Sequence, residues 1–279
     1  MRTTNRKKPG LKIYVMTDLE GCAGVVQWEG RKDETPWNIR MRRQKSRLLT
    51  GEVNAAVDGA FAAGATEVVV DDSHGGAYTI DFERLDPRAR IIHGRERPRI
   101  MAGMDKSYDG MIFVGAHAMA RTKGAVLYHT MSLETREIRI NGKPIGEIGI
   151  FMFVAGAFGV PTLMVTGDAA ACREAKALVP GLVTVAVKEG YSRYSALSWA
   201  PKRARKMIRA AVKECVAKRA RIKPLVFEPP FTYQEDAFPA GSDASASDPA
   251  KLPATWTTHE EVRAASAREL IDKVWGREV

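Results

Sequence analysis

Short apolar runs recur along the chain and predict the strands of a sheet. Five runs are dominated by Val, Ile, Leu and Met and are bounded by polar residues or glycine: residues 11–17, 67–71, 110–115, 162–166 and 183–187. Continuous apolar runs of this length are typical of strands that are buried on both faces of a parallel sheet. We therefore expect these five segments to form the centre of one sheet.

Between these strands the apolar residues recur at helical spacing. Residues 43–63 place Leu49, Val53 and Val57 on one side of a helix, and Gly64 follows as its end signal. The same reasoning predicts helices at residues 147–158, 168–178, 201–219 and 259–274. Alternating strands and helices indicate an α/β fold with an open, mostly parallel sheet flanked by helices.

Weaker patterns predict the remaining elements. A hairpin turns at Asn141-Gly142, the preferred two-residue turn, and joins strands at residues 136–140 and 143–145. Further strands are predicted at residues 89–92, 124–128, 224–231 and 255–258, a short helix at 99–103, and loops at 21–38 and 237–248. Long loops beside strand ends are often functional.

Composition limits the class of protein. The 279 residues are 45% hydrophobic, which is enough for a full core, and no apolar run is long enough to span a bilayer. We expect a disordered basic tail at residues 1–10 and one domain at residues 11–279, which could divide into two subdomains. The tail lacks the apolar segment of a secretory signal, and the three cysteines form no Cys-x-x-Cys pair, so we expect a cytoplasmic protein with reduced thiols.

The formal charge of +10 raises the question of a nucleic-acid partner. The basic residues concentrate in the N-terminal tail and in two predicted helices, residues 40–47 and 202–223, where apolar residues separate the charges. That arrangement is typical of a solvated helix face, and no aromatic residues alternate with the basic ones as in a stacking groove. We therefore expect neither a nucleic-acid nor a membrane partner.

Polar side chains that can bind metal follow several predicted strands. Asp18 and Glu20 follow the first strand, and His74, His117 and His129 each follow another. In an open α/β sheet, sites form outside the carboxyl ends of the strands. Imidazole and carboxylate together hold catalytic zinc and related divalent metals. The sequence thus predicts a metal-dependent hydrolase, with Glu147, at the start of an apolar helix, as a further candidate or as an acid that favours the helix dipole.

Other catalytic motifs are absent from the sequence. It has no Gly-x-Gly-x-x-Gly after a strand, no Walker A lysine loop and no Gly-x-Ser-x-Gly elbow. His259-Glu260-Glu261 lacks the second histidine of the zincin helix, and we expect His93 and His259 to have no catalytic role. Dinucleotide, nucleotide and serine-hydrolase chemistry are therefore not indicated.

The residues that carry these candidates make the chain resemble the zinc-dependent D-aminopeptidase family, which is associated with bacterial dipeptide transport. The resemblance runs from about residue 12 to residue 187 and fades after it. It rests on six short motifs: Thr17-Asp18-Leu19-Glu20-Gly21, Asp71-Asp72-Ser73-His74, Met101-Ala102-Gly103-Met104-Asp105, Val114-Gly115-Ala116-His117-Ala118, His129-Thr130-Met131-Ser132 and Gly146-Glu147-Ile148-Gly149.

The resemblance implies a centre of two zinc ions per chain, with manganese or cobalt as alternatives. It implies as ligands Asp18, Glu20, His74, His117 and Glu147, with Asp18 bridging both ions, and His129 as the catalytic histidine. It also implies an α/β fold with a smaller second α/β region, and a homo-oligomeric ring that encloses the active sites. The part of the chain from about residue 188 would then shape the assembly.

The function expected from these observations is an aminopeptidase that hydrolyses short peptides, with D-amino acids at the N-terminal end. Two metals would polarise the scissile carbonyl and lower the pKa of a bound water. Two alternatives are a metal-dependent amidohydrolase acting on a non-peptide amide and a non-catalytic basic binding protein. The sequence leaves open whether His129 is a base, a nucleophile or an oxyanion stabiliser.

Overall fold

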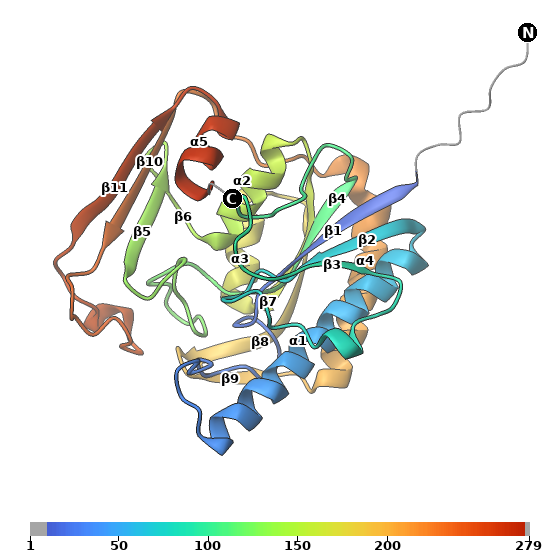
Figure 1. The fold of residues 1–279 in the computed structure, drawn as a ribbon, viewed down its shortest axis with the longest axis horizontal. Helices are drawn as coiled ribbons and strands as arrows, with labels where there is room; N and C mark the ends of the chain where they lie inside the picture. The colour runs from blue at the N-terminus through green and yellow to red at the C-terminus, as the bar shows by residue number, and fades with distance from the viewer. Residues whose placement is uncertain (1–9, 277–279) are drawn as a thin grey trace, which may run out of the picture.

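A seven-stranded sheet forms the centre of the computed structural model, which describes residues 10–276 (Figure 1). Its strand order is β3-β2-β1-β4-β7-β8-β9, and all neighbours are parallel except β8 and β9. The strands are β1 (Leu11–Thr17), β2 (Ala65–Asp71), β3 (Arg90–Ile92), β4 (Gly110–Ala116), β7 (Thr162–Asp168), β8 (Val183–Ser192) and β9 (Ser195–Ser198). The five predicted core strands are all present in it. The predicted tail lies outside the described residues except for Gly10.

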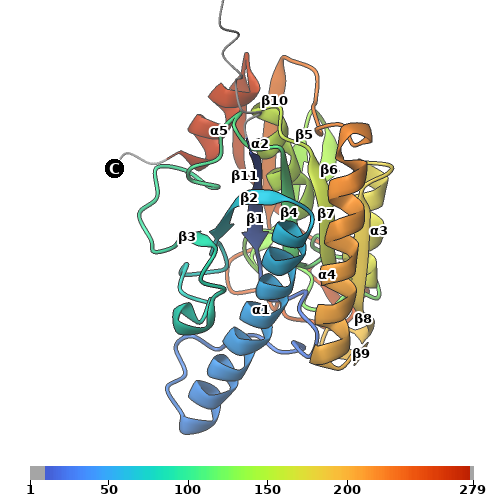
Figure 2. The ribbon, with the colours of Figure 1, turned by 90° about the vertical axis from the view of Figure 1, so that its right-hand side faces the viewer.

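Two helices cover each face of this sheet. Helices α1 (Pro36–Ala62) and α4 (Pro201–Lys218) pack side by side on one face, and α2 (Glu147–Ala157) and α3 (Ala169–Leu178) pack together on the other (Figure 2). Helix α1 begins within the predicted loop, because the Thr35 hydroxyl accepts a hydrogen bond from the Asn38 backbone and Pro36 suits the first turn. Its fully buried face includes Leu49, Val53 and Val57.

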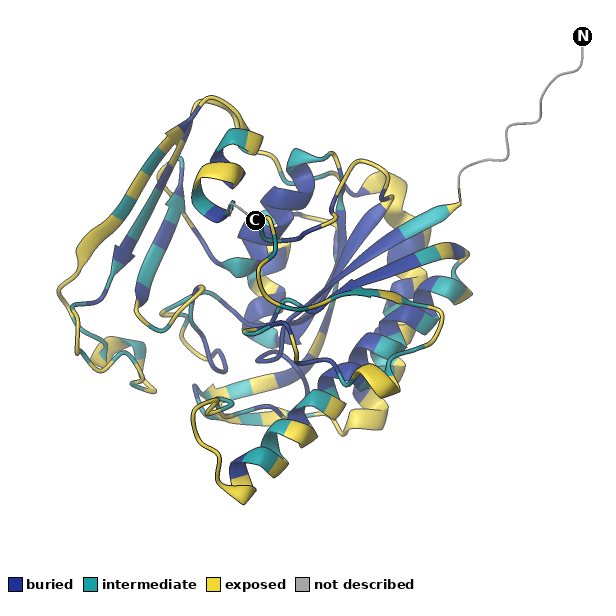
Figure 3. Cartoon of the chain, in the orientation of Figure 1, coloured by how far each residue is buried: buried dark blue, intermediate teal, exposed yellow. Residues whose placement is uncertain are grey.

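A second, smaller sheet lies beside the first and contains segments from distant parts of the sequence. Its antiparallel order is β11-β10-β5-β6, from β5 (Thr135–Ile140), β6 (Lys143–Ile145), β10 (Phe231–Ala237) and β11 (Thr257–Ala264). Helix α5 (Ala267–Trp275) packs on β10 and β11 and also meets α2. The mixed fold and its smaller second region are therefore as expected. The strands of the main sheet consist largely of buried residues, whereas most residues of β11 are exposed or partly exposed (Figure 3).

Three predicted elements are wrong. Residues 124–128 form turns rather than a strand, because β4 already pairs with β1 and β7 and leaves no free edge there. Residues 99–103 form turns in which Met101 and Gly103 have positive φ, so no helix forms. The predicted helix at 259–274 is instead β11 followed by α5, since β10 provides a pairing partner for β11 and Ser266 caps a helix that begins at Ala267.

Several boundaries also differ from the prediction. The strand expected at residues 224–231 begins only at Phe231, and β9 was not predicted. Three short 3-10 helices are found among the described residues: η1 (Phe82–Arg84), η2 (Arg219–Arg221) and η3 (Pro249–Lys251). Among residues 10–276, no helix has both the length and the apolar character needed to cross a bilayer.

Candidate metal centre

The candidate residues gather where the strand order of the main sheet reverses direction. Strand β1 lies between β2 and β4, and later strands are added beyond β2 on one side and beyond β4 on the other. Asp18 and Glu20 follow β1, His74 follows β2, and His117 follows β4. A crevice outside the carboxyl ends of parallel strands at such a point is the usual ligand site of an open α/β sheet.

Two glycines allow the loops after β1 and β4 to touch. A Cβ atom added to Gly21 would lie 2.0 Å from the Ala116 carbonyl oxygen, and one added to Gly115 would lie 2.0 Å from the Asp18 carbonyl oxygen. Gly115 also has a φ of +80°, which side chains other than glycine rarely adopt. The close approach places Asp18 beside His117, although 99 residues separate them in the sequence.

The first group of candidate ligands contains Asp18, Glu20 and His74, all of which are buried. The Nε2 atom of His74 lies 3.1 Å from Glu20 Oε1, and its Nδ1 atom lies 3.0 Å from the Thr79 hydroxyl. A guanidinium nitrogen of Arg31 also lies 3.2 Å from His74 Nε2. Arg31 is half-exposed and pairs with Glu29 at 2.8 Å, so it has a second partner. The bond to Thr79 orients the His74 ring so that Nε2 faces the carboxylates.

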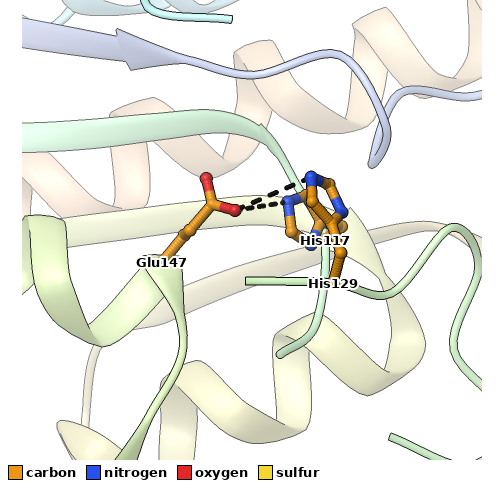
Figure 4. A group of neighbouring side chains, drawn as sticks. All are labelled: His117, His129 and Glu147. Carbon is orange, nitrogen blue, oxygen red and sulfur yellow. Dashed lines mark ion pairs between the residues drawn. The ribbon is translucent and has the colours of Figure 1, made fainter. Parts of the chain in front are cut away.

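The second group contains His117, His129 and Glu147 (Figure 4). Glu147 is the first residue of α2, and its Oε1 atom lies 3.2 Å from His117 Nε2 and 3.8 Å from His129 Nε2. The two rings stack with their centroids 4.0 Å apart. Each ring points its Nδ1 atom at a backbone carbonyl, that of Ala118 for His117 and that of Leu127 for His129. Both Nε2 atoms therefore face the carboxylate, as the figure shows.

Asp18 connects the two groups. Its Oδ1 atom accepts a hydrogen bond from the Leu19 backbone, and its Oδ2 atom lies 3.3 Å from His117 Nε2. Among residues 10–276, Asp18 Oδ2, Glu20 Oε2 and His117 Nε2 are buried and make no hydrogen bond, because the ion-pair contacts of Asp18 and Glu147 with His117 Nε2 do not have hydrogen-bond geometry. Buried polar atoms without partners are costly unless a ligand or ion satisfies them. Three such atoms at one place match the donor set of a divalent metal.

The protonation of these groups reflects a concentration of negative charge. Burial, together with the Glu20 carboxylate, holds the pKa of Asp18 well above its usual value. Burial would lower the pKa of His74, but Glu20 and Asp18 raise it to about 9. The pKa of Glu147 is lowered instead. Burial favours the neutral form of this carboxyl, but His117 and His129 lower its pKa to about 2. Three carboxylates in one buried site thus attract positive charge, from protons or from metal cations.

A cavity of about 1260 Å³ opens onto both groups. Its wall includes Asp18, Glu20, His74, His129 and Glu147, whereas His117 lies behind them and is 2% exposed. Phe151 of α2 and Trp275 of α5 also line it, so the second sheet region contributes to the wall. This volume exceeds that of most small-ligand pockets and leaves room for a peptide.

Sequence reasoning missed two buried ionisable side chains, Lys188 and Glu52, that hold the loop that carries Asp18 and Glu20 and its continuation. The Lys188 ammonium, on β8, donates hydrogen bonds to the backbone carbonyls of Glu20, Cys22 (2.9 Å) and Val25 (2.5 Å). Glu52, on α1, accepts one from the Ala23 backbone at 2.9 Å. In the sequence Lys188 comes directly after the predicted apolar strand at residues 183–187, and that position was the available signal.

The other two histidines lie apart from these groups. His93 stacks on Phe82 with ring centroids 5.5 Å apart, and His259 is an exposed residue of β11. The structure therefore brings together all six predicted site residues and leaves out the two histidines for which no catalytic role was expected.

Comparisons with known proteins agree on one family. The sequence model of the M55 peptidase family, described as D-aminopeptidase, matches residues 11–261. A D-aminopeptidase of Bacillus subtilis (strain 168) is 36% identical to the chain over 218 residues, which is 77% of each sequence. The solved structure of the Zn-dependent D-aminopeptidase DppA from Bacillus subtilis, a self-compartmentalizing protease, superimposes with a TM-score of 0.81. It covers 94% of both chains at 28% identity.

Proposed function

The chain belongs to the D-aminopeptidase family, and we propose that it is a zinc-dependent aminopeptidase that removes D-amino acids from the N-terminal ends of short peptides. The observation that carries the proposal is the meeting of two buried groups of imidazoles and carboxylates at Asp18, beside an open cavity. A similar solved structure is a Zn-dependent D-aminopeptidase, which supports zinc over manganese or cobalt.

Two ions would share five ligands. We assign Asp18, Glu20 and His74 to one ion, and Asp18, His117 and Glu147 to the other. The contact of Asp18 with His117 on one side and its place beside Glu20 and His74 on the other support a bridging role. The buried atoms without partners support the fit, since each is a suitable donor to zinc. His74 Nε2 is available to an ion when the Arg31 guanidinium pairs with Glu29 and does not contact His74.

We assign His129 to catalysis rather than to metal binding. Its Nε2 atom is farther from Glu147 than that of His117, and its ring lines the cavity whereas His117 lies behind it. Burial and the neighbouring His117 lower the pKa of His129, which favours a neutral imidazole. The hydrogen bond from Nδ1 to the Leu127 carbonyl leaves Nε2 with a free lone pair on the cavity side. A neutral ring in this tautomer can accept a proton.

The chemistry then divides among the metals and the side chains. When bound, zinc acts as a Lewis acid that polarises a carbonyl group and lowers the pKa of a water molecule. His129 takes a proton at Nε2 and can return it to the leaving amine. Trp28 meets the edge of the His129 ring with centroids 5.2 Å apart and limits access of solvent to it. Arg31 and Glu29, from the same loop, form an ion pair on the cavity wall.

We further propose that the chain forms a homo-oligomeric ring in the cytoplasm and that the part after about residue 188 shapes this assembly. Two observations support the ring. The relative DppA is described as self-compartmentalizing, and the β8–β9 hairpin at the edge of the main sheet exposes Tyr191, Leu197 and Trp199. Exposed apolar patches of this kind often mark interfaces. Light scattering tests it: a monomer at micromolar concentration would contradict the ring.

The activity is tested with a panel of matched substrates. Zinc-loaded protein is assayed on D- and L-alanine amides, on dipeptides with each configuration at the first residue, and on cyclic non-peptide amides. We expect hydrolysis of the D-configured amide and dipeptide, and much slower hydrolysis of the L-configured ones. Turnover of the cyclic amides alone would favour an amidohydrolase instead. A blocked N-terminal amine should abolish cleavage, as an aminopeptidase requires.

A further inference from the structure

The loop that carries His129 has an unfavourable backbone conformation on both sides of the histidine. Leu127 has a φ of 49° and Met131 a φ of 61°. Non-glycine residues rarely adopt this left-handed region, and they persist there only when surrounding contacts hold them. Such strain is common at functional sites, where it fixes a side chain in one orientation. The loop therefore needs external support, and the source of that support can be traced.

The orientation of the His129 ring depends on the peptide groups of this loop. Its Nδ1 atom lies 2.9 Å from the carbonyl oxygen of Leu127, two residues earlier in the chain. This contact fixes the tautomer and turns Nε2 toward Glu147. A rotation of the Leu127 or Tyr128 peptide would move that carbonyl and release the ring. Whatever holds these two peptides also holds the histidine.

Arg193, in the turn between β8 and β9, binds both peptides. Its backbone carbonyl accepts a hydrogen bond from the Leu127 N–H at 2.8 Å, and its guanidinium donates one to the Tyr128 carbonyl at 2.8 Å. The guanidinium also stacks on the Tyr128 ring, 4.2 Å from the centroid. Arg193 is 2% exposed, which is unusual for an arginine. Arg193 itself does not line the cavity, although its guanidinium lies 5.5 Å from the ring centroid of Trp28, a wall residue that also contacts the His129 ring.

The buried guanidinium is held in turn by residues 244–246, which lie in the predicted loop at residues 237–248. One of its nitrogens donates to the carbonyls of Ala244 at 2.6 Å and Ala246 at 3.1 Å. The Tyr128 hydroxyl donates to the same Ala246 carbonyl, and the Tyr194 hydroxyl donates to the Ser245 carbonyl at 2.5 Å. All acceptors described for this guanidinium are backbone carbonyls, so Arg193 connects the backbones of two loops.

We propose that Arg193 is a positioning residue for His129, and that residues 244–246 hold Arg193 in place. The C-terminal segment would then serve the catalytic step as well as any assembly. The inference rests on the proposed function only in giving His129 a catalytic role. The geometry that it describes, one fixed tautomer of His129, can be measured without any substrate.

The test compares Arg193→Met with a matched control, Arg203→Met, in zinc-loaded protein. Arg203 also stacks on an aromatic ring, that of Trp199 at 5.6 Å, but it is an exposed residue of α4 and does not line the cavity. We expect Arg193→Met to lower kcat by on the order of tenfold to a hundredfold, because small displacements of catalytic groups have effects of this size. KM and zinc content should stay within twofold, and Arg203→Met should match the parent.

Nitrogen NMR of labelled histidines gives the second readout. In the parent the His129 signals should report a neutral ring with the proton on Nδ1, and in Arg193→Met a mixture of tautomers. If that variant does not fold, Tyr128→Phe removes only the bond to Ala246 and should shift the same signals by a smaller amount. Unchanged signals together with an unchanged kcat would overturn the proposal. A parent with no peptidase activity but with the expected signals and shifts would refute the proposed function alone.

Discussion

Replacing Lys188 with methionine should destabilise the protein and loosen the loop that carries Asp18 and Glu20. The methionine keeps the apolar part of the side chain but removes an ammonium that donates to three backbone carbonyls, those of Glu20, Cys22 and Val25. Hydrogen bonds from a charged donor contribute about 1.5–3 kcal/mol each, so the gross loss is roughly 5–9 kcal/mol. Removing a buried ammonium returns several kcal/mol of desolvation free energy. The net loss in unfolding free energy should be roughly 2–4 kcal/mol.

The assay is urea unfolding in the presence of a chelator, so that metal binding does not contribute to stability. A loss of this size corresponds to a fall in melting temperature of roughly 5–15 °C for a chain of this length. Zinc affinity, measured by competition with a chromophoric chelator, should fall as well, because the carboxylates lose their fixed positions. Lys218→Met is the control, since Lys218 is exposed and pairs with the exposed Glu214, and it should change stability by less than about 1 kcal/mol. A Lys188→Met protein as stable as the parent would refute the reasoning.

Two further predictions concern titration and the division of roles between the histidines. Burial raises the pKa of Glu52 to about 7, above the usual value of 4.5, so its contribution to stability is full below pH 4.5 and is lost as the pH rises through 7. Between pH 5 and 8 the free energy of unfolding should therefore fall less in Glu52→Gln than in the parent, by up to about 3 kcal/mol, as measured by urea unfolding. Identical pH profiles of the two proteins would contradict the assignment. His129→Ala should keep its zinc and fold but lose on the order of a hundredfold in kcat, whereas His117→Ala should lose zinc and activity together; equal zinc loss in both variants would show that His129 is a ligand.

Much of the main sheet could be predicted because its strands are buried on both faces and their sequences are continuously apolar. The same criterion failed at residues 124–128, where Ala125, Val126 and Leu127 are fully buried although they lie in a loop. An apolar run indicates burial but not strand pairing, which depends on whether a neighbouring edge is free. The prediction of a helix over the residues of β11 was wrong for a different reason. Their pairing partner, β10, lies about 25 residues earlier in the chain, and local spacing cannot reveal such a partner.

The candidate site was predictable to the extent that its residues follow strand ends. His74, His117, Asp18 and Glu20 lie there, and the topology of the sheet brings those ends together. The supporting residues could not be found in this way. Arg193 and Lys188 look like ordinary charged residues of a hairpin, and their burial depends on carbonyl groups that loops from distant parts of the sequence present. Such contacts have no pattern in the sequence.

Metal analysis of protein purified without chelator tests the account most directly. The five assigned ligands predict about two zinc ions per chain, and Asp18→Ala should lose both, because only Asp18 lies between the two groups. Glu20→Ala, which alters one group alone, should retain one ion. A parent protein that is free of metal and still hydrolyses D-configured peptides would contradict the account, and an Asp18→Ala protein that keeps one zinc ion would contradict the bridging role.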